Sequence, residues 1–157
     1  ESGVIDAAEW VGPWNDLTFG FHKVAKNYYG PGFHEGSTCN EFMMNRGAWD
    51  RLPQDLKDIV YAACITCNNH APAEYFARNA ESLPILVNKH GVEIRNYPQD
   101  IITQMYKISR DVLEETAQED SLTNRVYSNW SKFQQLSMDY QPLSNYGFIK
   151  DRSKAYN

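Results

Sequence analysis

The 157-residue sequence lacks the features that mark several large classes of protein. Its three cysteines, Cys39, Cys64 and Cys67, are an odd number and do not make the disulfide framework of a small secreted domain. No cluster of Lys and Arg accompanies the formal net charge of −5, so no nucleic acid is expected as a partner. No apolar run approaches the ~20 residues that a membrane-spanning helix needs.

Common catalytic motifs are also missing. The glycines of NYYGPGFHEGS match neither GxGxxG nor GxxxxGK[ST], and no serine lies in a nucleophile elbow. The four histidines show no HxxxH or HExxH spacing. His90 is expected at a helix end and His22 on a helix surface, whereas His34 lies in a glycine-rich loop of the kind that often carries function. We therefore expect a protein that is not an enzyme.

One CxxC motif, Cys64 to Cys67, could belong to a redox pair or to half of a zinc site. Both cysteines nevertheless share a helical face with Ile59 and Val60, and no second CxxC or histidine pair follows. Burial as small hydrophobic residues is therefore the favoured interpretation.

What the sequence does contain indicates a helix-rich α/β protein. Residues 4–10, 37–45 and 92–97 are predicted as short strands, and a short helix is predicted from Asn15 or Asp16. A helical turn over 46–53 precedes a long segment of period 3.6, which Gly91 ends and in which Pro72 and Pro84 predict kinks or breaks. Two further helices are predicted: the first carries Ile101, Met105, Ile108, Val112 and Thr116, and the second carries, on a stripe expected to be buried, Leu122, Val126, Trp130, Phe133, Leu136 and Tyr140.

These elements suggest two segments. Residues 1–52 form a strand-helix-strand segment that carries the candidate site, and residues 53–157 form a helical segment with one short strand. Three short strands cannot bury two sheet faces by themselves. Because the chain starts with Glu1 and its apolar pattern begins at Val4, we expect a fragment or processed chain whose sheet is completed elsewhere, with any signal peptide removed.

The pair Glu9-Trp10 lies at the C-terminal end of the first predicted strand, where open α/β sheets bind ligands. A second carboxylate, Glu35, lies on the loop GPGFHEGS, which could fold back toward Glu9. Two carboxylates with backbone carbonyls suit a hard cation such as sodium or calcium. Spacing alone favours the simpler alternative of a solvated Glu9, a core Trp10 and an ordinary loop.

The segment GVIDAAEWVGPWNDLTFGFHKVAKNYYGPGFHEGSTCNEFMMN closely resembles the solute-binding proteins of TRAP transporters, the DctP-like family, and best matches their 2-oxo-acid-binding branch. The segment LPQDLKDIVYAAC also resembles this family, and the likeness fades after about Gly91. The resemblance implies a periplasmic protein with the C-terminal part of a periplasmic-binding-protein type II fold. Such a protein captures a small organic acid, a 2-oxo or hydroxy acid, for sodium-driven uptake through TRAP membrane permease subunits.

The resemblance also implies roles for individual residues. Glu9 and Glu35 match the family's cation-binding carboxylates, and Trp10 offers its carbonyl to the cation and its ring to the ligand. Phe33 and His34 stand where the branch has two aromatic residues that contact the ligand, and the histidine is a departure. No arginine here matches the family's carboxylate-binding arginine, so we expect the 157-residue piece alone to bind organic acids, and with them the sodium or calcium ion, weakly or not at all.

Two other hypotheses remain open. A metalloenzyme could use Glu9, Glu35 and His34, although the sequence offers no further strong ligand at good spacing. A periplasmic ligand-sensing or helical interaction module without a transport role could use the two amphipathic helices after Pro98, which could also pair in a homodimer.

Overall fold

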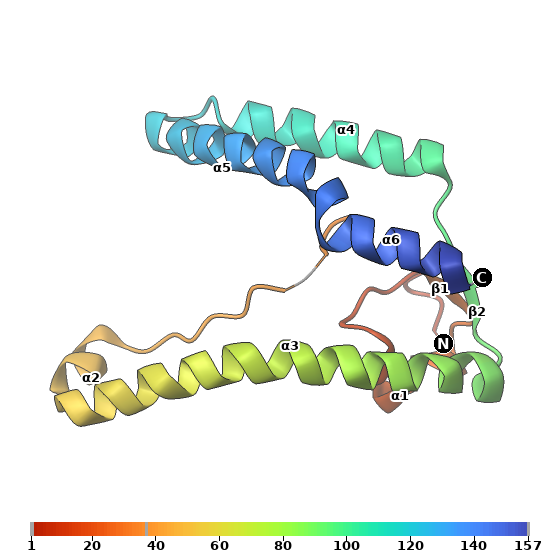
Figure 1. Cartoon of the computed structure of the whole chain (residues 1–157), viewed down its shortest axis with the longest axis horizontal. Coiled ribbons are helices and arrows are strands. Elements are labelled where there is room, and N and C mark those ends of the chain that lie inside the picture. Colours follow the sequence, from red (N-terminus) through yellow and green to blue (C-terminus); the bar gives the residue numbers. More distant parts are fainter. Residues whose placement is uncertain (1, 37, 157) are drawn as a thin grey trace. The chain divides into compact units, whose positions relative to one another are not determined.

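The computed structural model describes residues 2–36 and 38–156 and contains two compact units, Glu1–Tyr97 and Pro98–Asn157 (Figure 1). The elements of the first unit are α1 (Pro13–Phe19), the 3-10 helix η1 (Phe21–Lys23), β1 (Asn27–Tyr29), α2 (Arg46–Arg51), α3 (Gln54–His90) and β2 (Glu93–Arg95). The second unit contains α4 (Gln99–Thr116), α5 (Ser121–Tyr140), the 3-10 helix η2 (Gln141–Leu143) and α6 (Asn145–Tyr156). The predicted division after residue 52 stays a prediction.

The long helix α3 organises the first unit. It begins after Pro53 and ends at Gly91, whose left-handed backbone (φ 64°, ψ 34°) supplies the predicted stop. Of the kinks or breaks expected at Pro72 and Pro84, a break is wrong, because α3 continues through both for 37 residues, and a kink stays a prediction. Each proline removes one backbone donor only, and strong helix formers such as alanine, glutamate and leucine flank the two positions.

The sheet consists of β1 and β2, which pair in parallel with Tyr28 opposite Ile94. β2 lies in the predicted strand 92–97, but no strand was predicted at its partner β1. The predicted strands over 4–10 and 38–45 do not form in the part of the chain that the structure describes, and Ser37 lies outside that part. A strand needs a neighbour to receive its hydrogen bonds, and these segments lie beside no other strand in the described residues.

The small core of the first unit lies between α1, η1 and the C-terminal part of α3, which Figure 1 shows beside α1. Leu86 and Val92 are almost fully buried there, together with the polar residues Asp16, Ser82 and His22. The expectation that His22 lies on a helix surface is wrong. The helix α1 ends at Phe19, before His22 is reached. The 3-10 helix η1 then places the His22 ring against that of His90, with 4.0 Å between ring centroids.

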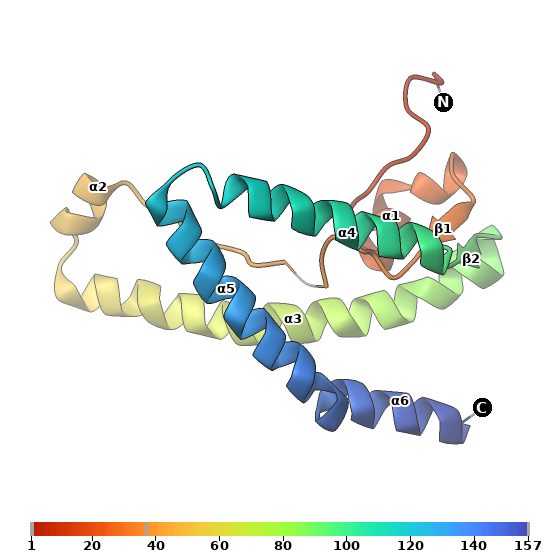
Figure 2. The same ribbon diagram turned by 90° about the horizontal axis from the view of Figure 1, so that it is seen from above.

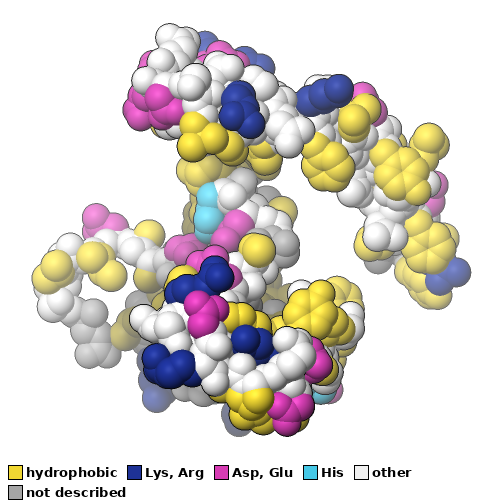
Figure 3. Space-filling model, turned by 90° about the vertical axis from the view of Figure 1, so that its left-hand side faces the viewer, with side chains coloured by type: hydrophobic (Ala, Val, Ile, Leu, Met, Phe, Trp, Pro, Cys, Tyr) yellow, Lys and Arg dark blue, Asp and Glu magenta, His cyan; other side chains and the backbone are white. Residues whose placement is uncertain are grey.

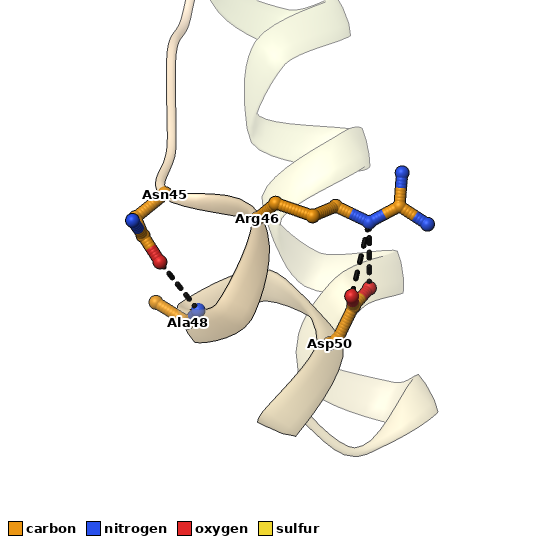
Figure 4. A network of polar contacts seen from close by, with 4 residues as sticks. All are labelled: Asn45, Arg46, Ala48 and Asp50. Carbon is orange, nitrogen blue, oxygen red and sulfur yellow. Dashed lines mark hydrogen bonds and ion pairs between the residues drawn. The ribbon is translucent and has the colours of Figure 1, made fainter.

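The short helix α2 confirms the predicted helical turn. Asn45 caps it by accepting a hydrogen bond from the backbone N–H of Ala48 at 3.1 Å, and Arg46 donates to Asp50 one turn later at 3.0 Å (Figure 4). On the following helix α3, the expected burial of both cysteines is wrong, because Cys64 is half-buried and Cys67 is exposed. The CxxC segment therefore lies on a face that the described residues leave largely uncovered.

In the second unit the predicted helices α4 and α5 are confirmed, and the two helices run in opposite directions from a short turn (Figure 2). Asp120 caps α5 by accepting from the backbone N–H groups of Leu122 and Thr123. The Thr123 hydroxyl also donates to Asp120, and these hydrogen bonds lower the pKa of that carboxyl. The segment after Tyr140, for which no element was predicted, forms η2 and α6.

The expectation that the apolar stripe of α5 is buried is wrong for the described residues, and α4 also exposes apolar side chains. Ile108, Val126 and Phe133 are each more than half exposed, and Ala117 is the buried hydrophobic residue of this unit. Large hydrophobic side chains also lie at the surface of the face drawn in Figure 3. No described helix combines the length and the apolar character that crossing a membrane would require.

Candidate cation and ligand site

Three of the residues singled out by the sequence meet in the first unit. The Nε2 atom of His34 lies 4.0 Å from Glu9 Oε1 and 3.8 Å from Glu35 Oε1. One ligand atom from each of these residues lies within 4.8 Å of the other two. The structure therefore brings together two carboxylates and one imidazole from segments more than twenty positions apart in the sequence.

This spacing is compatible with ligands of a single ion. Two oxygen ligands on opposite sides of a cation with bonds of about 2.4 Å are separated by about 4.8 Å. The three side chains are 43–62% exposed, so solvent or a ligand can reach them. Within residues 2–36 and 38–156, the ion pairs of Glu9 and Glu35 are with His34 and with no Lys or Arg. The two carboxylates thus retain charge that a bound cation could neutralise.

The segment after Glu9 is held by a residue that the sequence analysis missed. Asn79 of α3 accepts, through Oδ1, a hydrogen bond of 2.9 Å from the backbone N–H of Trp14, in the first turn of α1. The N-cap position of α1, Gly12, has no side chain to provide this acceptor. No local sequence signal could have identified Asn79, because it follows Trp14 by 65 positions.

The loop that carries His34 and Glu35 is held at its start. The Gly30 N–H donates to the carbonyl of Arg95 at 3.0 Å, and the Asn96 side chain donates to the carbonyl of Gly30 at 2.8 Å. These contacts join the loop to the end of β2. The sequence analysis assigned no role to Asn96, since the contact depends on the unpredicted pairing of β1 with β2.

The predicted aromatic residues lie beside other rings. Phe33 contacts His34 edge to face, with 5.7 Å between ring centroids. The Trp10 ring is half exposed and makes a similar contact with Phe19, the last residue of α1, also at 5.7 Å. Both rings are therefore accessible enough to contact a ligand, and the roles assigned to them remain predictions.

A buried acid lies near the candidate site in α1. Asp16 accepts a 2.6 Å hydrogen bond from the Tyr28 hydroxyl. Burial raises the pKa of Asp16, the bond from Tyr28 opposes that shift, and the charge of Glu9 adds to it. Burial also raises the pKa of Tyr28, as do the hydrogen bond to Asp16 and its charge, so the phenol remains protonated. Glu9 therefore lies close enough to Asp16 for its charge to affect the pKa of that carboxyl.

Proteins of known function share this architecture. The chain is 38% identical over 133 residues to a monocarboxylate 2-oxoacid-binding periplasmic protein of Nostoc sp. strain PCC 7120, an alignment that covers 85% of this chain and 36% of that protein. The fold also matches a TRAP transporter solute-binding protein of Bordetella bronchiseptica RB50 with a TM-score of 0.89 and 32% identity, over 98% of this chain and 46% of that one. That protein was solved as a mixed-occupancy dimer, with copurified calcium and picolinate in the bound active site and with an apo site.

A second solved structure of a TRAP solute-binding protein also matches this fold. A TRAP periplasmic solute-binding protein of Pseudoalteromonas atlantica T6c, with bound sodium and pyruvate, matches with a TM-score of 0.85 and 31% identity over 93% of this chain and 44% of that one. The chain therefore spans less than half the length of these relatives. The likeness confirms the expected fold class, a helix-rich part of such a binding protein with a small, incomplete sheet. The DctP family model, described as bacterial extracellular solute-binding protein, family 7, matches residues 1–120, and the chain belongs to this family.

Proposed function

We propose that this chain is part of the periplasmic solute-binding component of a TRAP transporter, which captures a small 2-oxo or hydroxy acid together with a metal cation. The observation that carries the proposal is the convergence of Glu9, His34 and Glu35 within 4.8 Å, in a chain of this family. Two solved relatives support it, one with sodium and pyruvate and the other with calcium and picolinate. Their family consists of binding proteins and not of enzymes.

In this proposal some residues of the site bind the cation and others contact the organic acid. Glu9 and Glu35 hold the cation with their carboxylates, and Trp10 contributes its backbone carbonyl. The bound sodium or calcium ion supplies the positive charge that attracts the acid's carboxylate. The rings of Trp10 and Phe33 flank the organic part of the ligand and exclude water from one side of it. His34 lies beside both glutamates, and in this proposal its ring contacts the organic ligand.

The proposed partners are the TRAP membrane permease subunits, to which the loaded protein delivers its acid. A homodimer is a further proposed partner, because α4 and α5 expose apolar side chains and the Bordetella relative was solved as a dimer. The same exposed helices favour the second candidate function, a periplasmic ligand-sensing or interaction module without transport.

The substitution Glu35→Ala in the full-length protein tests the main proposal. Loss of one of two charged ligands should weaken pyruvate and calcium binding together, each by on the order of tenfold or more, since even residues that only orient metal ligands are worth about 10–100-fold. Isothermal titration with pyruvate, once at a saturating calcium concentration and once without added calcium, measures both effects. Glu41→Ala is the matched control, because Glu41 is an exposed glutamate of the neighbouring segment. Unchanged affinities in Glu35→Ala would contradict the proposal.

A further inference from the structure

We infer that His34 binds the cation directly through Nε2, and that this third ligand makes the site prefer a first-row transition-metal dication such as Ni²⁺ or Zn²⁺. The inference rests on the proposed function, since it concerns the same site. In this inference His34 contacts the ion and not the organic ligand. The preferred cation then differs from the sodium and calcium bound in the solved relatives.

The orientation of the imidazole carries the first step. One edge of the ring lies over Gly32, because a Cβ atom on that glycine would be 3.5 Å from His34 Cε1 and 3.7 Å from Nδ1. Nε2, the second ring nitrogen, lies 4.0 Å from Glu9 Oε1 and 3.8 Å from Glu35 Oε1. The ring also makes the edge-to-face contact with Phe33 described above. His34 therefore presents a ring nitrogen to the point between the two carboxylates.

The ligand types carry the second step. Sodium and calcium are hard ions that bind oxygen, so an imidazole nitrogen adds little to their affinity. Imidazole suits Zn, Ni, Cu and Fe, whose affinities for mixed nitrogen and oxygen ligands exceed those of harder ions. Three protein ligands, here one imidazole and two carboxylates, also leave coordination positions on the ion open for an added ligand. The organic acid can therefore bind the same ion through its own oxygens.

The test uses the full-length protein, freed of metal by a chelator and titrated by calorimetry with NiCl₂ or CaCl₂ at one neutral pH. His34→Phe should weaken Ni²⁺ binding by at least about tenfold, because it removes a direct ligand, and should leave Ca²⁺ affinity nearly unchanged. His70→Phe is the matched control. His70 is also exposed, and its Nε2 lies 3.4 Å from Glu74, so it measures what an ordinary surface histidine-glutamate pair contributes.

A spectroscopic measurement separates direct ligation from an indirect effect on folding. Electron paramagnetic resonance of the Cu²⁺-loaded protein should show coupling to an imidazole nitrogen in the unmodified protein and in His70→Phe. The coupling should be lost in His34→Phe, while circular dichroism shows that this variant is folded.

The outcomes distinguish the two proposals. Unchanged Ni²⁺ affinity in His34→Phe, an equal loss of Ni²⁺ and Ca²⁺ affinity, or retained imidazole coupling would overturn the role of His34. If calcium and pyruvate still bind in that case, the proposed function stands without it. If the unmodified protein binds neither cation, both proposals fail.

Discussion

At the scale of single residues, Gly12 controls how the chain passes from Glu9 into α1. Its backbone (φ 157°, ψ −178°) lies in a region that residues with a side chain rarely adopt, and an added Cβ would be 3.1 Å from Asn79 Oδ1. Gly12→Ala should therefore destabilise the fold by about 1–3 kcal/mol. Urea unfolding measures this, and Gly36→Ala, whose Cβ meets nothing within 4 Å, should show little change. Equal losses in both variants would contradict the role of Gly12.

The buried His22 predicts how stability depends on pH. Burial lowers its pKa below the ordinary 6.5, and the charges of His90, Lys23 and Lys26 lower it further. As pH falls below 6.5, the unfolded chain binds a proton that the folded chain does not, so the free energy of unfolding should decrease until the folded pKa is passed.

Urea unfolding on both sides of pH 6.5 measures this effect. His22→Gln should reduce the dependence, whereas the same change at the exposed His70 should leave it in place. An identical pH profile for His22→Gln and the unmodified protein would contradict the assignment to His22.

At the scale of elements, α5 depends on its N-terminal cap. Asp120 accepts hydrogen bonds from two backbone N–H groups at 2.7 and 2.9 Å and from the Thr123 hydroxyl at 2.6 Å. Asp120→Ala should lower the urea midpoint of the second unit, because the first turn of α5 loses these acceptors. The helical circular dichroism signal, followed against urea concentration, measures this midpoint. Asp139→Ala, in the last turn of the same helix, is the control and should not lower the midpoint.

Local signals predicted most of the helices and the strand β2, but not the strand β1. The apolar period identified α4 and α5, and Gly91 marked the end of α3, because caps and periodicity act within a few residues. The strands predicted over 4–10 and 38–45 depended on neighbours that the described residues do not supply. α6 was missed because its start follows Pro142 closely and its sequence is polar.

At the scale of the whole molecule, the exposed faces of α4 and α5 predict self-association. Phe133 is 69% and Val126 62% exposed on α5, an apolar surface that a second copy could cover. Light scattering of the full-length protein should give the mass of a dimer. Val126→Glu should shift it toward the monomer, whereas the polar change Asn129→Glu nearby should not. A monomeric mass for the unmodified protein at every concentration would contradict this prediction.

The candidate site could be predicted in part. The sequence singled out Glu9, His34 and Glu35 by residue type and resemblance, and the structure brings their ligand atoms together. Their roles in binding remain predictions. Asn79 and Asn96 could not be found, because each acts on a backbone group more than sixty positions away and no local pattern records such a contact.

The candidate site exists only where distant segments have already docked, since Glu9 depends on the contact of α1 with α3 and Glu35 follows a loop joined to β2. The unfolded chain has no such arrangement, so an ion that binds there binds the native state alone. Mass action then couples occupancy to folding: at a hundred times its dissociation constant, the ion adds about 2.7 kcal/mol to the free energy of unfolding. The supply of metal would thus affect the stability of the folded protein as well as its loading.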